Sequence, residues 1–197
     1  MEHKSGCLVC GAGLAYFEAA RPLACWHCQE TSYANVSCVH GHFVCDRCHG
    51  SSANDLIERY CTQTTETDPV AIATALMQSP LLKMHGPEHH FLIPAALLAA
   101  YYNQGATGCR AGNAPAITEK ARLLAEARRR AEQVPGGACG FWGACGAAVG
   151  AGIFLSLITQ ATPLSVKAWR LSNGVTAGAL KVIAEHGGPR CCKRGTF

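Results

Sequence analysis

The sequence is poor in charge and has no apolar leader. Only 15 % of its 197 residues are charged and 49 % are apolar, a composition that excludes a disordered chain and predicts a buried core. The net charge of +4 is too mild to indicate a nucleic-acid partner by itself. Residues 1–6 lead directly into a Cys-x-x-Cys motif without an apolar signal segment. We therefore expect a protein of the reducing cytoplasm.

One long uncharged stretch, residues 138–166, has the length of a membrane span. It contains several glycines and the polar Ser156, Thr159 and Gln160, and its hydrophobicity per residue is modest. This composition favours a buried helix of a soluble domain over a membrane helix.

The chain divides into a Cys/His-rich segment, residues 1–50, and a longer segment, residues 51–197, with helical patterns. Short strands are expected near residues 14–18 and 32–37, between the cysteine motifs. The later helices are expected over residues 53–61, 69–78, 91–102, 116–133, a glycine-rich stretch ending near 159, and 163–185. The sequence thus predicts a mainly α protein, in which a zinc-ribbon-like or RING-like two-zinc module precedes an all-helical domain of five to six helices.

Two pairs of residues mark expected helix starts. Asp68-Pro69 and Thr162-Pro163 each place a side-chain acceptor at the cap and a proline at the first helical position. Pro94 lies inside a helical pattern and is expected to kink it.

Four closely spaced pairs of cysteine and histidine supply the candidate metal ligands. They are Cys7 and Cys10, Cys25 and Cys28, Cys38 and His42, and Cys45 and Cys48. Zinc prefers four thiolate or imidazole ligands in a tetrahedron, and one tight Cys-x-x-Cys turn supplies two of them. Eight ligands therefore predict two zinc ions in closed sites that serve a structural role. Of the spare histidines, His40 could replace His42, although the spacing to Cys45 favours His42.

The assignment of these pairs to two zinc ions has two solutions. Sequential pairing joins the first two pairs and the last two. Interleaved pairing joins the first pair to the third, and the second to the fourth. The run CVHGHFVCDRC resembles the middle of a RING finger, in which the pairs interleave. A RING finger has its further cysteine pair downstream, whereas here it lies upstream, so ubiquitin-ligase activity does not follow.

A second group of cysteines lies near the end of the sequence, at Cys139, Cys145, Cys191 and Cys192. Glycines surround the first two, and basic residues, including Lys193, accompany the last two. Basic neighbours and helix N-termini favour thiolates, which iron–sulfur clusters, soft metals and disulfide exchange all require. We predict that the four thiols form a cofactor-binding group. The alternative for Cys139 and Cys145 is simple core packing.

The segment HGPEHH adds His85, Glu88 and His89 as candidate partners of this group. It matches the H-x-x-E-H string of one zinc-peptidase class, but Gly86-Pro87 breaks the helical turn that this motif needs. We expect His85 as a cofactor ligand, and Glu88 and His89 as acid–base groups beside Cys191 and Cys192. The isolated Cys61 and Cys109 have no predicted role. The arginines at 128–130 are expected on a solvated, partly paired helix face.

Several strings carry a family resemblance: CVHGHFVCDRCHG, MHGPEHHFLIPAALLAAY, VPGGACGFWGACGAAVGAGIF and EHGGPRCCKR. The chain resembles a domain-of-unknown-function family of anaerobic bacteria and archaea. Members of that family are sometimes associated with S-adenosylmethionine-dependent methyltransferases. The resemblance implies that these strings hold the residues around which the family is built, and it implies no activity.

The leading hypothesis is a redox or sulfur-handling protein, in which the C-terminal cysteines hold a [4Fe-4S]-type cluster or act as reactive thiols. The alternative is a zinc-dependent adaptor that docks on a partner such as a methyltransferase. Nucleic-acid binding and membrane binding are less favoured. The sequence does not decide whether the protein is an enzyme, nor does it name a substrate or an oligomeric state.

Overall fold

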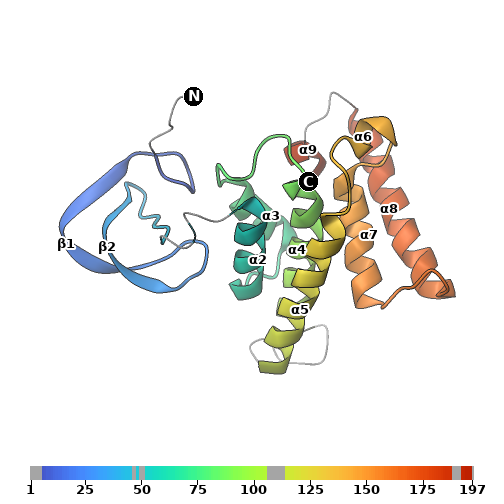
Figure 1. Cartoon of the computed structure of the whole chain (residues 1–197), viewed down its shortest axis with the longest axis horizontal. Helices are drawn as coiled ribbons and strands as arrows, with labels where there is room; N and C mark the ends of the chain where they lie inside the picture. Colours follow the sequence, from blue (N-terminus) through green and yellow to red (C-terminus); the bar gives the residue numbers. More distant parts are fainter. Residues whose placement is uncertain (1–5, 46–47, 49–51, 106–113, 188–191, 197) are drawn as a thin grey trace.

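A computed structural model describes residues 6–45, 48, 52–105, 114–187 and 192–196 of the chain. Its described part is mainly helical and begins with a two-stranded ribbon, β1 (Leu14–Ala24) and β2 (Thr31–Cys38). Figure 1 shows the curled ribbon at one end of the molecule and the helices at the other. The expected mainly α class is confirmed.

The strands pair antiparallel, with Leu14 opposite Cys38 and Ala24 opposite Thr31. A bulge interrupts the pairing of β1 between Tyr16 and Arg21, and bulges bend and twist a ribbon locally. Both predicted strands therefore exist, and both are longer than expected from the sequence.

The described helices include six of nine or more residues and two short ones. They are α2 (Ala53–Gln63), α3 (Pro69–Met77), α4 (Glu88–Asn103), α5 (Ala114–Ala131), α6 (Ala138–Phe141), α7 (Gly146–Ile158), α8 (Val166–His186) and α9 (Cys192–Thr196). The six longer helices follow the predicted order. The glycine-rich stretch, expected as one helix, is divided into α6 and α7.

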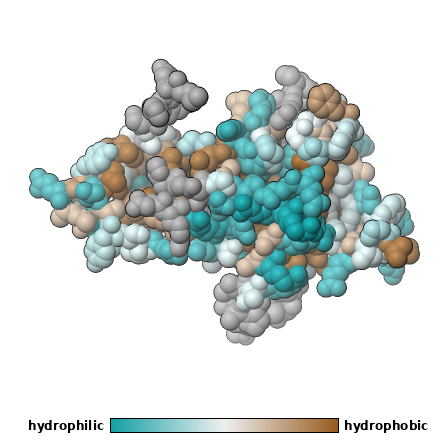
Figure 2. Space-filling model, in the orientation of Figure 1, coloured by the Kyte–Doolittle hydropathy of each residue, from teal (hydrophilic) through white to brown (hydrophobic). Residues whose placement is uncertain are grey.

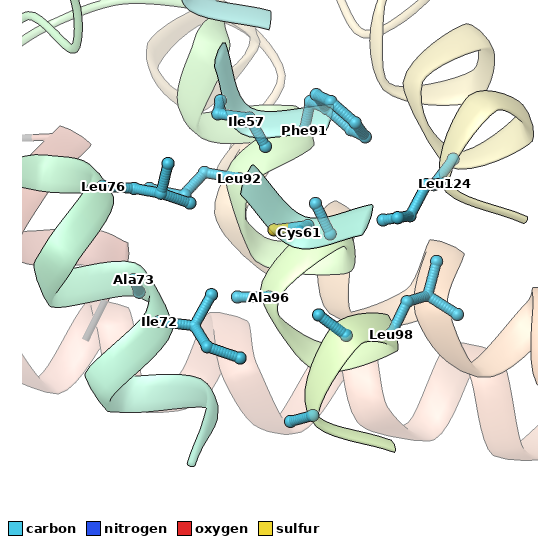
Figure 3. Close-up of a cluster of buried hydrophobic side chains, with 14 of the residues drawn as sticks. Ile57, Cys61, Ile72, Ala73, Leu76, Phe91, Leu92, Ala96, Leu98 and Leu124 are labelled. Carbon is cyan, nitrogen blue, oxygen red and sulfur yellow. The ribbon is translucent and has the colours of Figure 1, made fainter. Parts of the chain in front are cut away.

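The main core surrounds α4, which contacts α2, α3, α5 and α7. Figure 3 shows side chains from several helices meeting there, with Leu92 of α4 beside Leu76 and Ala96 of α4 near Ile72. Cys61 is fully buried in this core, as expected of a cysteine used as a small apolar side chain.

Glycines let α7 approach its two neighbours closely. A Cβ added at Gly150 would lie 2.8 Å from Pro94 Cδ and 2.9 Å from the His90 carbonyl oxygen, both in α4. A Cβ added at Gly152 would overlap Thr176 of α8. The uncharged stretch is thus packed between protein elements, and no described helix has the length and apolarity of a membrane span.

One of the two expected helix starts is wrong. Asp68 caps α3 through the Val70 N–H, with Pro69 at the first turn, as predicted. Helix α8 instead begins after Ser165, not at Thr162-Pro163. The Thr162 N–H donates to Ser165 Oγ, and Thr162 Oγ1 accepts from Leu164 N–H. These bonds close a separate turn, so the helix starts only beyond it.

The arginines of α5 form more ion pairs than we expected for a solvated helix face. Arg128 donates to Asp55 and Glu58 of α2, each at 2.8 Å, and to Glu132 at 2.9 Å. Arg129 and Arg130 pair with Glu126 of their own helix. Figure 2 shows the resulting hydrophilic surface over α5. Arg128 therefore joins two helices, which the sequence pattern did not indicate.

Candidate metal centres and a thiol-lined cavity

The antiparallel pairing of β1 and β2 determines which cysteine pairs lie close together. Cys7 and Cys10 precede β1, and Cys38 ends β2, so antiparallel pairing places them at the same end of the ribbon. Cys25 and Cys28 lie in the turn between the strands. The chain after β2 returns to this turn, where the Trp26 N–H donates to the Phe43 carbonyl at 2.8 Å.

The structure accordingly forms two interleaved groups. Their members are Cys7, Cys10, Cys38 and His42 in one, and Cys25, Cys28, Cys45 and Cys48 in the other. Within each group all ligand atoms lie within 4.8 Å of one another. The eight predicted ligands are therefore brought together in the RING-like arrangement rather than in sequential pairs.

The first group presents three thiols and one imidazole nitrogen. Cys10 Sγ lies 3.5 Å from Cys38 Sγ, and Cys7 Sγ lies 3.8 Å from His42 Nδ1. Trp26 packs edge-on against the His42 ring at 4.7 Å and fixes its orientation. His40 Nδ1 also lies 3.7 Å from Cys10 Sγ, so the alternative histidine of the sequence stands beside the group rather than in it.

The second group presents four thiols, with Cys28 Sγ 3.8 Å from Cys45 Sγ. A Zn–S bond measures about 2.3 Å, so two thiolates on one tetrahedral zinc stand roughly 3.8 Å apart. The spacing and donor chemistry of both groups fit a tetrahedral ion of zinc type. The two groups could each hold one metal ion.

Burial and backbone N–H groups change the pKa values of the thiols of the second group. Burial raises the pKa of Cys28 and of Cys48. Burial also works against a Cys25 thiolate, but N–H donors that include Cys45 outweigh it and lower the pKa of Cys25 to about 7. A divalent metal would stabilise thiolates throughout the group.

Two side chains near this group were missed at the sequence level. Arg59 of α2 lies 2.9 Å from Cys48 Sγ through its Nη1, so a helix cation meets a metal-group thiol. His27 is 2 % exposed, and neither ring nitrogen has a hydrogen-bond partner among the described residues. Burial, with Arg59 nearby, lowers the pKa of His27 to about 4. The helical pattern of α2 gave no signal that one arginine reaches the metal module.

A cavity of about 900 Å³ lies between α4, α6, α7, α8 and α9. Cys139 of α6, Cys145 at the start of α7 and Cys192 of α9 all line it. Apolar side chains of α8, such as Leu180 and Ile183, form another wall. Three of the four predicted C-terminal cysteines thus reach one cavity, and Cys191 lies outside the described residues.

Helix α9 lies close enough to α7 for this convergence. A Cβ added at Gly195 would stand 3.8 Å from Cys145 Sγ. Lys193 Nζ donates to the Met77 carbonyl at 2.7 Å, which ties the same short helix to α3. Its sequence position after a glycine-rich link gave no indication of either contact.

His89 lines the cavity and also anchors α9. Its Nε2 lies 2.8 Å from the Lys83 carbonyl and its Nδ1 lies 3.0 Å from Thr196 Oγ1. Because a carbonyl only accepts, Nε2 carries a proton. The Thr196 hydroxyl also donates to the Cys192 carbonyl at 2.9 Å, within α9. Burial lowers the pKa of His89 and favours a neutral imidazole. Both nitrogens are engaged, and an acid–base role for His89 stays a prediction.

His90, which the sequence also predicts in the first turn of this helix facing a pocket, lines the cavity beside His89. Its Nδ1 donates to the Val134 carbonyl at 3.1 Å, so the connection after α5 fixes the ring. A Cβ added at Gly146 would overlap the His90 imidazole. Glycine at this position therefore lets the start of α7 lie directly against the ring.

The other two expected partners lie elsewhere. Glu88 accepts from the Lys83 N–H at 2.9 Å and closes its own loop, and it does not line the cavity. His85 is exposed and does not line the cavity either. The structure therefore does not bring them to the described thiols, and their predicted roles lack geometric support.

Comparison with known proteins assigns the helical part of the chain to a family. No curated protein and no solved structure matches it. A family of unknown function, DUF5714, matches residues 57–197, which include the whole thiol-lined cavity. The two metal groups lie before that segment. The chain therefore belongs to the family of unknown function DUF5714.

Proposed function

We propose that this protein is a zinc-stabilised redox or sulfur-handling protein, whose helical domain holds a thiolate-ligated [4Fe-4S]-type cluster. The observation that carries the proposal is the convergence of Cys139, Cys145 and Cys192 on one cavity from three separate helices. Cys191 is the proposed fourth ligand. Zinc in the two N-terminal groups would have a structural role, because each group closes its tetrahedron with protein ligands.

Among the described residues, the cavity thiols do not form a compact single-ion group. Both N-terminal groups gather their ligand atoms within 4.8 Å, and no such group is formed by the cavity cysteines among the residues described. A single tetrahedral ion needs that compact arrangement. A cubane cluster spreads its thiolates over separate irons and so accepts more widely spaced ligands.

The residues around the thiols suit such a group. Glycines at 140 and 143 leave open space, since a Cβ at either would meet no atom within 4 Å. The apolar wall of α8 limits water near the thiols, and low polarity influences the reduction potential of a cluster. A bound cluster would supply electron transfer or sulfur chemistry, while His89 would hold α9, and with it Cys192, in place.

Metal analysis of full-length protein purified without oxygen tests this proposal. We expect two zinc ions and about four irons per chain, with iron–sulfur absorption in the visible spectrum. Cys191→Ser/Cys192→Ser should lose the iron and the colour but keep zinc and helical content. Cys61→Ser, which changes a core cysteine away from the cavity, should keep both metals. A colourless wild-type protein with two zincs and no iron would reject the cluster.

A docking role is the second candidate, supported by exposed aromatic side chains on α6 and just after it. Phe141 is 88 % exposed and Trp142 is 70 % exposed. Figure 2 shows a hydrophobic patch in the region of α6. If the protein is an adaptor for a methyltransferase, Trp142→Ser should weaken binding to that enzyme in calorimetry. Because Trp142 does not line the thiol cavity, the metal content should stay unchanged. If the variant binds the enzyme as tightly as the wild type does, the exposed aromatic side chains no longer support a docking role.

A further inference from the structure

Helix α8 exposes one continuous face to solvent. It packs against α7 through residues such as Ser172 and Thr176, and Figure 1 shows it at the edge of the helical part. None of its residues is fully buried. We define the α8 seam as the exposed residues Lys167, Leu171, Gly174, Val175, Gly178, Val182 and Glu185. Apart from the adjacent Gly174 and Val175, these positions recur every three or four residues, and all of them share one side of the helix.

The seam contains two glycines that packing within the described part of the chain does not explain. Glycine in a helix interior is unfavourable relative to alanine, because it gives up more backbone freedom on folding. At Gly146, Gly150 and Gly152 an added Cβ would meet a neighbouring element, which accounts for the glycine. At Gly174 and Gly178 an added Cβ would meet nothing within 4 Å.

Apolar side chains flank these glycines on both sides. Leu171 is 52 % exposed, Val175 is 40 % exposed and Val182 is 52 % exposed. A surface of large side chains around a glycine centre suits a second helix that approaches closely at the centre. The side chains at the centre of the seam are small and those toward both ends are large. The seam therefore has nearly the same shape from its N-terminal end as from its C-terminal end.

The charges at the two ends select the partner and its direction. Lys167 lies at the start of the seam and Glu185 at its end. In an antiparallel pair of identical helices, with Gly174 opposite Gly178, each Lys167 meets a Glu185 of the other copy. A parallel pair would oppose lysine to lysine and glutamate to glutamate, which is repulsive. The intrachain partner of Glu185, Lys181, is exposed and stands 4.0 Å away, so that pair contributes little.

We propose that the α8 seam binds the α8 seam of a second copy of this chain in an antiparallel, two-fold symmetric contact. A two-fold interface brings the same patch of both copies together and therefore requires self-complementary shape and charge. The seam meets both requirements. The contact does not require a cluster in the cavity, although Val182 belongs to the seam and also lines the cavity.

Sedimentation velocity of the full-length, zinc-loaded protein under reducing conditions tests the contact. The wild type should be a dimer at micromolar concentration. Val175→Glu/Val182→Glu should raise the dimer Kd by about 100-fold, because the contact would then remove carboxylates from water and place them among apolar side chains. Asn173→Glu is the matched control, since Asn173 is an exposed α8 residue outside the seam that bonds only to the Trp169 carbonyl in the contacts resolved for it. The control should remain dimeric.

Charge reversal tests the antiparallel direction. Lys167→Glu should raise the Kd by about tenfold, and Lys167→Glu/Glu185→Lys should restore the wild-type value. A monomeric wild type would overturn the proposal. So would a dimer that tolerates Val175→Glu/Val182→Glu, because the contact would then use another surface. If the charge-reversed double variant dimerises no better than Lys167→Glu, the antiparallel pairing is wrong.

Discussion

Arg59 illustrates how one side chain can connect two parts of the molecule. It belongs to α2, yet its guanidinium donates to Cys48 Sγ at 2.9 Å. Four thiolates around one divalent ion leave an excess of negative charge, which a nearby cation reduces. The same contact ties the metal module to the first helix of the core.

Removing this cation should weaken metal binding. We expect Arg59→Met to lower the zinc affinity of the Cys25 group by about 10–100-fold, as loss of a hydrogen bond to a metal ligand typically does. Competition with a chromophoric chelator measures the affinity. The matched control is Arg122→Met, because Arg122 is exposed and pairs with Glu119 on its own helix. Equal zinc affinities for all three proteins would show that Arg59 does not support the site.

Asp55 links helix capping to helix packing. It forms a capping box with Ser52 and accepts from Arg128 of α5. The Ser52 hydroxyl, together with Arg128, lowers the pKa of Asp55 to about 2. A lowered folded-state pKa contributes stability above the unfolded value, and this contribution is lost as the pH falls towards the folded value.

The Asp55 contribution should therefore disappear between about pH 4 and pH 2. We expect Asp55→Asn to be less stable than the wild type at pH 6, by no more than about 1 kcal/mol because the pair is partly exposed. The difference in urea unfolding free energy should vanish as the pH approaches 2. Using metal-free protein for both samples removes the effect of acid on zinc binding. A difference that stays constant with pH would assign the effect to something other than the carboxylate charge.

At the scale of elements, α4 and α7 approach closely because proline and glycine face each other. Pro94 has no N–H to donate within α4. Gly150 of α7 lies against this same turn, near Pro94 and the His90 carbonyl. The sequence predicted a kink from Pro94 but did not predict which helix would pack there.

Adding a side chain at Gly150, between α7 and α4, should destabilise the core. We expect Gly150→Ala to lower the unfolding free energy by about 1–3 kcal/mol, since backbone and proline atoms cannot move aside easily. Alanine is otherwise the better helix former, so a purely local effect would have the opposite sign. Gly140→Ala is the control because open space surrounds that position. Chemical denaturation of both variants gives the comparison, and a stabilised Gly150→Ala would contradict the packing argument.

At the scale of the whole molecule, the apolar core and the metal groups are separate. The main cluster of buried side chains comprises residues from Leu56 onwards. The two smaller clusters consist of the metal-group cysteines and their neighbours, all before residue 49. The small module has few large buried apolar side chains of its own, and small domains of this kind depend on metal for folding.

Metal removal should therefore unfold the N-terminal module and spare the helices. With a strong chelator, we expect amide protection to be lost across β1 and β2 and retained in α4, as measured by hydrogen exchange. Cys45→Ser should produce the same pattern. Loss of protection throughout the chain would show that the helices cannot fold without the module, and would argue against a boundary near residue 50.

The sequence by itself determined the features that depend on neighbours along the chain. The ligands occur as closely spaced pairs of cysteine or histidine along the chain, so this spacing identified the eight candidate ligands. Asp68 and Pro69 identified the start of α3 because capping is local. The Thr162-Pro163 prediction failed because Ser165 competes for the same local bonds.

The tertiary structure alone decided which distant residues meet. The ribbon register brings Cys7 and Cys38 to one end and so selects the interleaved metal groups. The RING-finger resemblance of the sequence had offered this pairing as one of two alternatives. Docking of α9 brings Cys192 to the cavity with Cys139 and Cys145, while Glu88 closes its own loop instead. These outcomes depend on contacts between segments tens of residues apart, and local spacing carries no information about such contacts.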